Sequence, residues 1–335
     1  MVSESKKALD AVAARYDFKV AYHSYPFGGE HYLKHDELLP DSALEEMRSM
    51  DGILFGALGH PDVKPGILER GILMRLRVEL DQYIHLRPVR LFPGVASPLK
   101  DKGPEQIDFV VVRENTGGIY SGVGGVSMRG TAHEVATESM VYSRMQVERC
   151  VSYAFDYALK NGRKRELSLC GKSSFLTYVG DLWDRVYEEL GERMFPEVNR
   201  SNYHIDEMCM LLVKRPEMFD VIVAPNMFGD ILADLGAVLQ GGVGYATCGN
   251  INPEGVSMFG PIGADFRTEV NTPQRIVPVA AVSAVSMLLE NLGETEAADQ
   301  VDSALMFICG TRLARTFGAY GSSEIGDMIA EQIVM

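Results

Sequence analysis

The stretch from residue 221 to residue 239 constrains the fold more than any other, because it joins an apolar run directly to a helical pattern. The run Val221-Ile222-Val223-Ala224 ends at a Pro-Asn pair, which is typical of a buried strand that closes on a turn. After Gly229, apolar residues recur at helical spacing on one side of the chain. The stretch therefore predicts a strand, a turn and a helix in immediate succession, a unit of an α/β fold.

Asp230 and Asp234 lie four residues apart at the start of this predicted helix, so their carboxylates share one face of its first turns. No Lys or Arg lies between them, and two like charges this close repel each other. A divalent cation would relieve that repulsion, and hard carboxylate oxygens suit Mg²⁺ or Mn²⁺. The alternative is an ordinary solvated acidic helix start, because Asp is common in first turns.

Composition narrows the classes of protein and partner. The chain of 335 residues is long enough for two domains or one large one. Its net charge of −14 is spread along the sequence, which argues against nucleic acid and anionic membranes as partners. Five cysteines without a C-x-x-C pair indicate reduced thiols and a cytoplasmic protein. No signal peptide is visible, and no apolar run reaches the ~18 residues of a membrane span.

Strand and helix patterns alternate along most of the chain, which favours an α/β fold with mostly parallel sheet. Residues 19–25 alternate like a further strand. Residues 117–137, rich in Gly, Ser and Thr, indicate a protruding hairpin. Residues 240–275 read as a long Gly/Asn/Pro-rich loop region, which is unusual in a compact domain unless it binds something.

Four predicted strands each deliver polar or charged groups at their carboxyl ends, where ligands sit in open α/β sheets. Asp206 and Asp230, together with Asp234, could chelate one metal ion. The residues at the four strand ends include Arg113, Lys172, Asp206, Asn226 and Asp230.

Basic and aromatic residues suggest how a substrate is held. Arg77, Arg87 and Arg113 each stand beside a predicted element end. Guanidinium forks bind carboxylates in a bidentate way, so three of them suggest a substrate with more than one carboxylate, although each could instead form a surface salt bridge. Tyr120 follows paired glycines and is either a packed aromatic or an acid. Lys172 is either a solvated lysine or, beside a metal, a general base.

Three stretches taken together resemble a known family. The first runs from Leu76 to Arg90 and contains Asp-Gln-Tyr and Leu-Arg-Pro-Val-Arg, the second is Val-Arg-Glu-Asn-Thr at residues 112–116, and the third runs from Asn226 to Asp234. This combination resembles the β-decarboxylating dehydrogenases, which include isopropylmalate, isocitrate, tartrate and D-malate dehydrogenases. The wording of the first two stretches is most similar to the tartrate/D-malate branch.

The resemblance implies an isopropylmalate dehydrogenase-like fold of two domains, formed by a chain that leaves and returns. Residues 1–82 and 241–335 would form the cofactor-side domain, and residues 83–240 the substrate, metal and dimerisation domain. The family places a strand and a nicotinamide-side loop before its first helix, whereas this chain begins at that helix. We therefore expect either that the true start lies upstream or that the cofactor-side domain lacks its first strand. The resemblance also implies a homodimer with shared active sites and a dimerisation arm at residues 117–137.

The reaction that the resemblance implies is the metal-dependent oxidative decarboxylation of a 2-hydroxy diacid (D-malate, tartrate or a 3-substituted malate) with NAD. The metal is Mg²⁺ or Mn²⁺, and two of the site residues come from the partner chain. By motif, Lys172 (from the partner) is the general base and Tyr120 the acid, Arg77, Arg87 and Arg113 bind the carboxylates, and Asp230, Asp234 and the partner's Asp206 hold the metal.

The dinucleotide side departs from the family pattern. Where the family's adenosine loop reads His-Gly-Ser-Ala-Pro-Asp, residues 263–269 here lack the His and place Thr268 in the Asp position. We expect Asn226 and either Asp265 or Glu269 to contact the cofactor. Two alternatives stay open beside an NAD-dependent dehydrogenase: an NAD-independent decarboxylase or lyase on the same scaffold, and a non-catalytic subunit of a hetero-oligomeric dehydrogenase.

Overall fold

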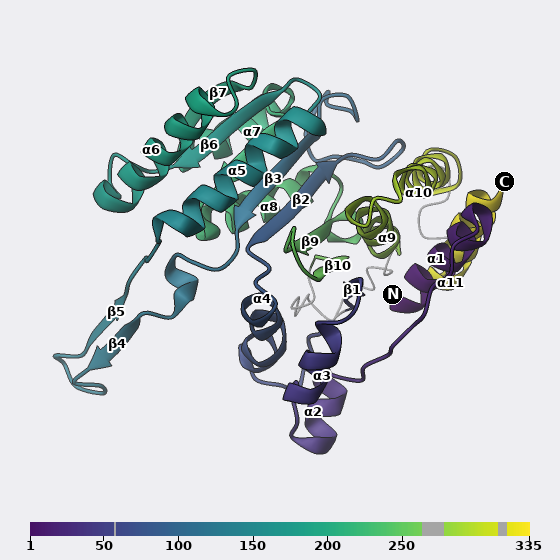
Figure 1. Ribbon diagram of the computed structural model, residues 1–335, viewed down its shortest axis with the longest axis horizontal. Coiled ribbons are helices and arrows are strands. Elements are labelled where there is room, and N and C mark those ends of the chain that lie inside the picture. The colour runs from purple at the N-terminus through teal and green to yellow at the C-terminus, as the bar shows by residue number, and fades with distance from the viewer. Residues whose placement is uncertain (57, 263–277, 314–319) are drawn as a thin grey trace. The chain divides into compact units, whose positions relative to one another are not determined.

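A computed structural model describes four parts of the chain, residues 1–56, 58–262, 278–313 and 320–335 (Figure 1). The chain forms two compact units, and it leaves and re-enters each of them. The first unit comprises Met1–Gln82, Arg90–Pro104 and Ala237–Met335, and the second comprises Tyr83–Val89 and Glu105–Gly236.

The second unit is built on five neighbouring strands, in the order β2 (Ile84–Arg90), β3 (Asp108–Glu114), β8 (Val221–Ala224), β6 (Glu166–Gly171) and β7 (Asn199–His204). The pairs β3–β8, β8–β6 and β6–β7 are parallel. Its main helices are α5 (Arg144–Lys160), α6 (Thr177–Arg193), α7 (Ile205–Lys214) and α8 (Asn226–Leu239). Helices α5 and α6 lie over one face of these strands, and α7 and α8 over the other (Figure 1). All four residues of β8 are therefore buried, and the predicted α/β fold with mostly parallel strands is confirmed.

A glycine brings α8 close to the sheet. A Cβ atom at Gly229 would lie 2.6 Å from the Cβ and 2.8 Å from the Cγ of Arg113 on β3. These separations are too short for two carbon atoms, so the first turns of α8 reach their distance from β3 only because residue 229 has no side chain. Gly229 thus places the adjoining Asp230 beside the strand that carries Arg113.

The predicted hairpin is confirmed. Strands β4 (Gly124–Ser127) and β5 (Val135–Glu138) pair antiparallel, with Gly124 opposite Glu138. Every residue of both strands is exposed. A two-stranded ribbon exposed on both faces has little stability of its own, so these strands form an arm that lacks a core.

The first unit contains three neighbouring strands, in the order β1 (Gly52–Leu54), β10 (Ser257–Pro261) and β9 (Thr247–Ile251); β1 and β10 are parallel and β9 is antiparallel to β10. Its long helices are α1 (Val2–Tyr16), α9 (Val279–Asn291), α10 (Thr295–Ile308) and α11 (Ser322–Val334). These four helices share one apolar core through Val12, Val285, Val301 and Ile329, each fully buried. Within the described ranges, no helix has the length and apolarity needed to cross a membrane.

Shorter helices complete the first unit. They are α2 (Gly29–His35), α3 (Asp41–Met47), the π-helical turn η1 (Glu69–Met74), α4 (Arg75–Glu79) and the π-helical turn η5 (Cys309–Leu313). A second apolar cluster includes Leu44 of α3, Ile72 of η1 and Leu76 of α4. The segment before Tyr83 is therefore helical, first as η1 and then as α4.

Two sequence-based predictions are wrong. Residues 19–25 form no strand; most of their side chains are exposed, and alternation alone cannot hold a strand that has no neighbour to receive its backbone hydrogen bonds. Residues 240–275 were predicted to be loop, yet β9 and β10 lie within them. The glycines that suggested a loop serve close strand packing instead, since a Cβ atom at Gly260 would lie 2.4 Å from the carbonyl oxygen of Phe55.

The close approach at Gly229 makes a prediction. In Gly229→Ala the added methyl group must push α8 away from β3, which is offset in part by the better helix propensity of alanine, so we expect a net loss of about 1–2 kcal/mol in the free energy of unfolding. Urea titration measures it. Gly125→Ala is the control, because no atom lies within 4 Å of a Cβ at that exposed position; equal effects in both variants would refute the packing argument.

Candidate active site

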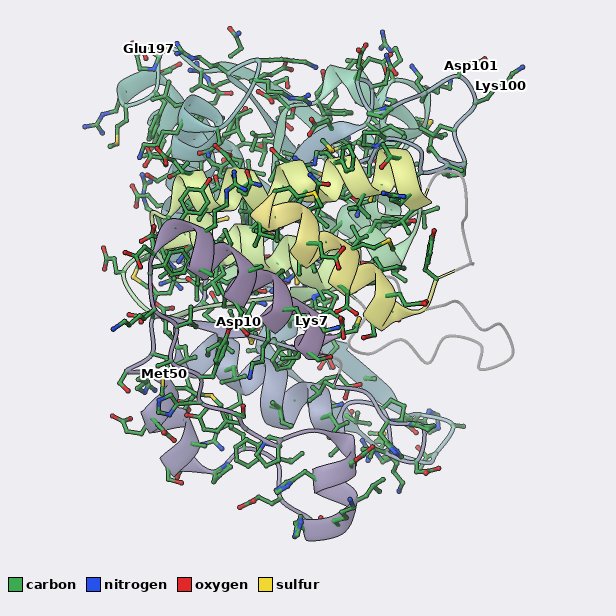
Figure 2. All side chains as sticks on the ribbon, turned by 90° about the vertical axis from the view of Figure 1, so that its right-hand side faces the viewer. Lys7, Asp10, Met50, Lys100, Asp101 and Glu197 are labelled. Atoms are coloured by element: carbon green, nitrogen blue, oxygen red, sulfur yellow. The ribbon has the colours of Figure 1, made fainter. Side chains whose placement is uncertain are left out.

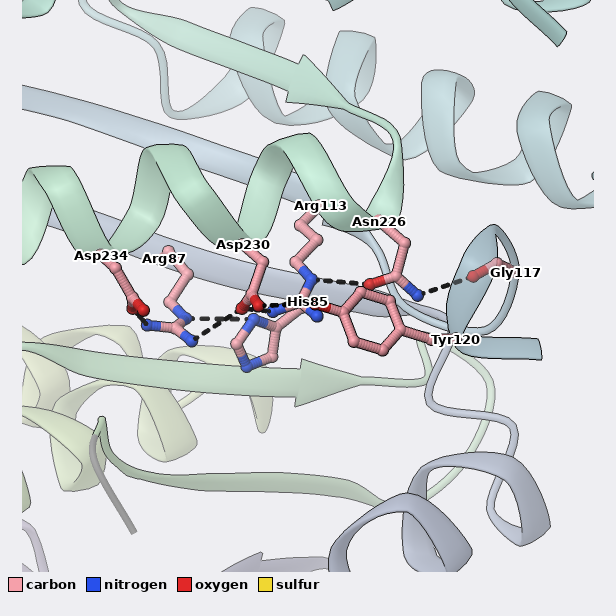
Figure 3. Close-up of polar contacts among 8 residues, drawn as sticks. All are labelled: His85, Arg87, Arg113, Gly117, Tyr120, Asn226, Asp230 and Asp234. Carbon is pink, nitrogen blue, oxygen red and sulfur yellow. Dashed lines mark hydrogen bonds and ion pairs between the residues drawn. The ribbon is translucent and has the colours of Figure 1, made fainter. Parts of the chain in front are cut away.

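Helix α8 begins directly after the buried strand β8, with only Pro225 between them. Asp230 and Asp234 lie one turn apart on α8, so their carboxylates project from the same side of the helix, as predicted. Figure 3 shows both carboxylates directed at the guanidinium groups of Arg87 and Arg113. The strand–turn–helix unit thus brings its acidic pair beside Arg87 of β2 and Arg113 of β3.

The two arginines meet the acidic pair from buried positions, with 7% of Arg87 and 4% of Arg113 exposed. Arg113 Nη1 donates to Asp230 Oδ1. Arg87 Nη1 lies 3.5 Å from Asp234 Oδ1, and its Nη2 lies 4.0 Å from Asp230 Oδ1 (Figure 3). Four of the predicted site residues therefore form one ion network.

Burial and charge oppose each other in this network. Burial lowers the pKa of the Arg113 guanidinium, and the charge of Asp230 acts against that shift. Burial raises the pKa of Asp234, and Arg87 acts against that shift. An incoming dicarboxylate would replace the aspartates as partners of the guanidiniums, while an incoming cation would replace the arginines as partners of the aspartates. The network can thus hold an anionic substrate and a cation side by side.

Asn226 fixes the orientation of Arg113. Its Oδ1 accepts a hydrogen bond of 2.9 Å from Arg113 Nε, and its Nδ2 donates to the carbonyl oxygen of Gly117 at 2.9 Å. Its backbone N–H donates to the hydroxyl of Tyr142 at 2.7 Å. Only 1% of Asn226 is exposed, so these three bonds tie the start of α8 to β3 and to the turn that follows β3.

Tyr120 joins the network from the short 3-10 helix η2 (Ile119–Ser121). Its hydroxyl donates to Asp230 Oδ2 at 2.9 Å, and the guanidinium carbon of Arg113 lies 5.5 Å from its ring centre. Burial, followed by the charge of Asp230, raises the pKa of the Tyr120 hydroxyl. The raised pKa keeps the proton on the hydroxyl, and 39% of the residue remains exposed.

A buried carboxylate holds the turn between β3 and Tyr120. Glu114 accepts hydrogen bonds from the Thr116 backbone N–H at 2.8 Å, from the Thr116 hydroxyl at 2.6 Å and from the Gly117 N–H at 2.8 Å. Burial raises the pKa of Glu114, and the bonds from Thr116 lower it. Neither Glu114 nor Tyr142 was assigned a role from the sequence. A signal for Glu114 is present in the sequence, because this residue belongs to the Val-Arg-Glu-Asn-Thr stretch.

Lys172 and Asp206 form a second, separate pair. Lys172 follows strand β6, Asp206 lies in the first turn of α7, and the lysine Nζ donates to Asp206 Oδ1. This hydrogen bond lowers the pKa of the Asp206 carboxyl. This pair lies outside the Arg87–Asp234 network. Among the described residues of a single chain, no group of three His, Cys, Asp or Glu side chains is placed to hold a metal.

Three further predicted site residues belong to other parts of the chain. Arg77 lies on α4, in the first unit. Asp265 and Glu269 lie outside the described residues. The donor set that is described fits Mg²⁺ or Mn²⁺, because Asp230 and Asp234 present carboxylate oxygens one helical turn apart. Two carboxylates from one chain leave room for a third from another.

Comparison with known proteins gives consistent matches. The sequence model for isocitrate/isopropylmalate dehydrogenase matches residues 1–315. A 3-isopropylmalate dehydrogenase of Thermobifida fusca is 44% identical over 99% of this chain and 94% of that protein, and one of Mycobacterium tuberculosis is 43% identical over 98% and 95%. The isocitrate dehydrogenase of Methylococcus capsulatus shares its fold with a TM-score of 0.87, at 26% identity over 100% of this chain and 95% of that one. These relatives do not support the tartrate/D-malate branch that the motif wording suggested.

The contacts of Asn226 generate a prediction. Asn226→Ala leaves the buried Nε–H of Arg113 and the carbonyl oxygen of Gly117 without their amide partner, which should lower the free energy of unfolding by about 2–3 kcal/mol. Denaturant titration measures the loss. Asn202→Ala is the matched control, because the Asn202 amide donates to Asp184 on the exposed surface and its loss should cost less than about 0.5 kcal/mol. Similar losses at both positions would contradict the role given to Asn226.

Proposed function

Because this chain belongs to the isocitrate/isopropylmalate dehydrogenase family, we propose that it oxidises and decarboxylates a 3-substituted malate, with 3-isopropylmalate as the first candidate. The chain is an NAD-dependent decarboxylating dehydrogenase that uses Mg²⁺ or Mn²⁺. The observation that carries the substrate proposal is the 44% identity to a 3-isopropylmalate dehydrogenase over 99% of the chain. D-malate and tartrate are the competing 2-hydroxy diacids.

The ion network gives the proposal its chemistry. Arg87 and Arg113, joined by Arg77 from the first unit, bind the carboxylates of the diacid through charge-assisted hydrogen bonds. Asp230 and Asp234, with Asp206 of a second copy of the chain, hold the divalent cation. When bound, the cation supplies Lewis acidity at the hydroxyl and carboxylate oxygens, and NAD⁺ supplies the acceptor for the hydride.

Proton transfer falls to two residues of the chain. Lys172 of the second copy accepts the proton of the 2-hydroxyl group as the 2-carbon is oxidised. After CO₂ leaves, Tyr120 donates a proton to the carbon that carried it. The protonated and accessible hydroxyl of Tyr120, raised in pKa by burial and by Asp230, supports its assignment as the acid.

In this proposal the cofactor binds the domain formed by residues 1–82 and 241–335, and the substrate and metal bind the domain formed by residues 83–240. Asn226 is proposed to contact the cofactor, although its amide already donates to Gly117 and accepts from Arg113. These two bonds use one of the two donor positions and one of the two acceptor positions of that amide. Asp265 or Glu269 is proposed for the ribose.

A homodimer with shared sites completes the proposal. The separation of the Lys172–Asp206 pair from the Asp230–Asp234 pair supports it, since a second copy can bring the two pairs together. So does apolar exposure on α7, where 57% of Met210 is accessible. The exposed arm of β4 and β5 supplies a further contact surface. A cytoplasmic location is proposed from the cysteines, all five of which are free.

A substrate panel tests the activity. With NAD⁺ and Mn²⁺, we expect NADH formation with the highest kcat/KM for 3-isopropylmalate, lower values for D-malate, tartrate and isocitrate, and loss of activity when EDTA removes the metal. A higher kcat/KM for D-malate or tartrate would move the substrate assignment to that branch. No NADH with any diacid would reject the dehydrogenase, and CO₂ release without nucleotide would identify a decarboxylase.

Complementation between inactive variants tests the shared site. One variant carries Lys172→Met and Asp206→Asn, and the other carries Asp230→Asn and Asp234→Asn. Each alone should be inactive, but a heterodimer has one site with no lesion, so a random equal mixture refolded together should recover about a quarter of the wild-type activity. If heterodimers form, as native mass spectrometry would show, and no activity returns, the sites lie within single chains.

A further inference from the structure

His85 is a buried neighbour of the ion network that neither the sequence patterns nor the family resemblance singled out. It lies two residues before Arg87 on β2, so the two side chains share one face of the strand. None of the His85 surface is exposed. Its Nδ1 lies 3.1 Å from Arg87 Nε and receives the hydrogen bond from it, and Figure 3 shows the ring beside the guanidinium.

This contact defines the chemical form of His85. A guanidinium has five N–H donors and no acceptor, so Nδ1 must offer a lone pair. The imidazole is therefore neutral, with its proton on Nε2. A protonated ring would turn a donor towards a donor and would bury two positive charges against each other.

The bond also selects which edge of Arg87 is offered to a ligand. A guanidinium can grip a carboxylate through its Nε edge or through its two terminal nitrogens. His85 occupies the Nε edge, and both terminal nitrogens lie towards Asp230 and Asp234. Arg113 follows the same pattern, because its Nε is taken by a neutral acceptor, Asn226 Oδ1, while its Nη1 contacts Asp230.

We propose that His85 is a positioning residue, a neutral acceptor that holds Arg87 with its two terminal nitrogens towards a substrate carboxylate. The proposal rests on the proposed function in one respect, namely that Arg87 binds the diacid. Rotation of Arg87 about its side-chain bonds would turn the fork away from the acidic pair, and the bond to His85 opposes that rotation. The expected consequence is tighter substrate binding with no effect on the nucleotide.

Two substitutions separate positioning from packing. His85→Leu introduces an apolar side chain of similar length and so removes the acceptor. His85→Asn instead places an amide oxygen where Nδ1 stood. We expect the leucine variant to raise the KM for the diacid about ten- to a hundredfold with a smaller change in kcat. The asparagine variant should stay within about threefold of the wild type, and the KM for NAD⁺ should be unchanged in both. Equal effects of leucine and asparagine, or an equal rise in the KM for NAD⁺, would overturn the proposal.

A second background checks that the effect runs through Arg87. Lysine has no Nε–H to donate to His85, so in Arg87→Lys the further change His85→Leu should alter the KM for the diacid by less than about twofold. Full additivity would show that His85 acts elsewhere.

A spectroscopic measurement needs no activity. ¹⁵N NMR of the histidine-labelled protein should show His85 with a bare Nδ1 and a protonated Nε2, and a proton on Nδ1 would refute the proposal even if a variant failed to fold. The two proposals fail separately. Absence of turnover by the wild type would refute the proposed dehydrogenase activity but would not affect the tautomer result.

Discussion

The attraction between the carboxylates of α8 and the guanidiniums of β2 and β3 is the interaction on which the candidate site depends. Folding takes Arg87 and Arg113 almost completely out of water, and removing one partner of such a buried pair costs about 3–5 kcal/mol. Asp230 contacts both arginines. The position of α8 is therefore set by charge as well as by the missing side chain at Gly229, and the same contacts form the site proposed to bind a dianion and a cation.

Two neutral side chains orient the guanidinium groups that the charged contacts hold in place. Asn226 and His85 each accept the Nε–H of one arginine, so neither guanidinium is free to turn, and their terminal nitrogens share the side of Asp230. On the other side, Glu114 ties down the turn that carries Tyr120. The proposed acid, cation ligands and anion ligands thus come from β2, from β3 with the turn that follows it, and from α8, all in one unit. Lys172 and Asp206 form a separate pair.

Much of this arrangement was predictable from the sequence, and the exceptions have physical reasons. The β8–α8 unit was predictable because a continuous apolar run and a helical repeat meet at Pro225, and the resemblance placed Arg87, Arg113, Tyr120 and the two aspartates in one site. The strand predicted at residues 19–25 is absent, because alternation gives no information about whether a neighbouring strand is present. Strands β9 and β10 were missed because glycine packs strands closely as readily as it forms loops. No pattern distinguishes His85 from an ordinary core histidine, so only coordinates reveal its bond to Arg87.

The pairing of α1 with α11 has a consequence for how the chain is made. Arg15 Nη1 donates to the carbonyl oxygen of Ile333 at 2.8 Å, across 318 residues of sequence. The whole second unit emerges from the ribosome between these two partners, and it can fold while translation continues. Helix α1 must wait, with the apolar face that includes Val12 uncovered, until the last helices are synthesised. Closing so long a loop is slow, so the first unit completes its core last.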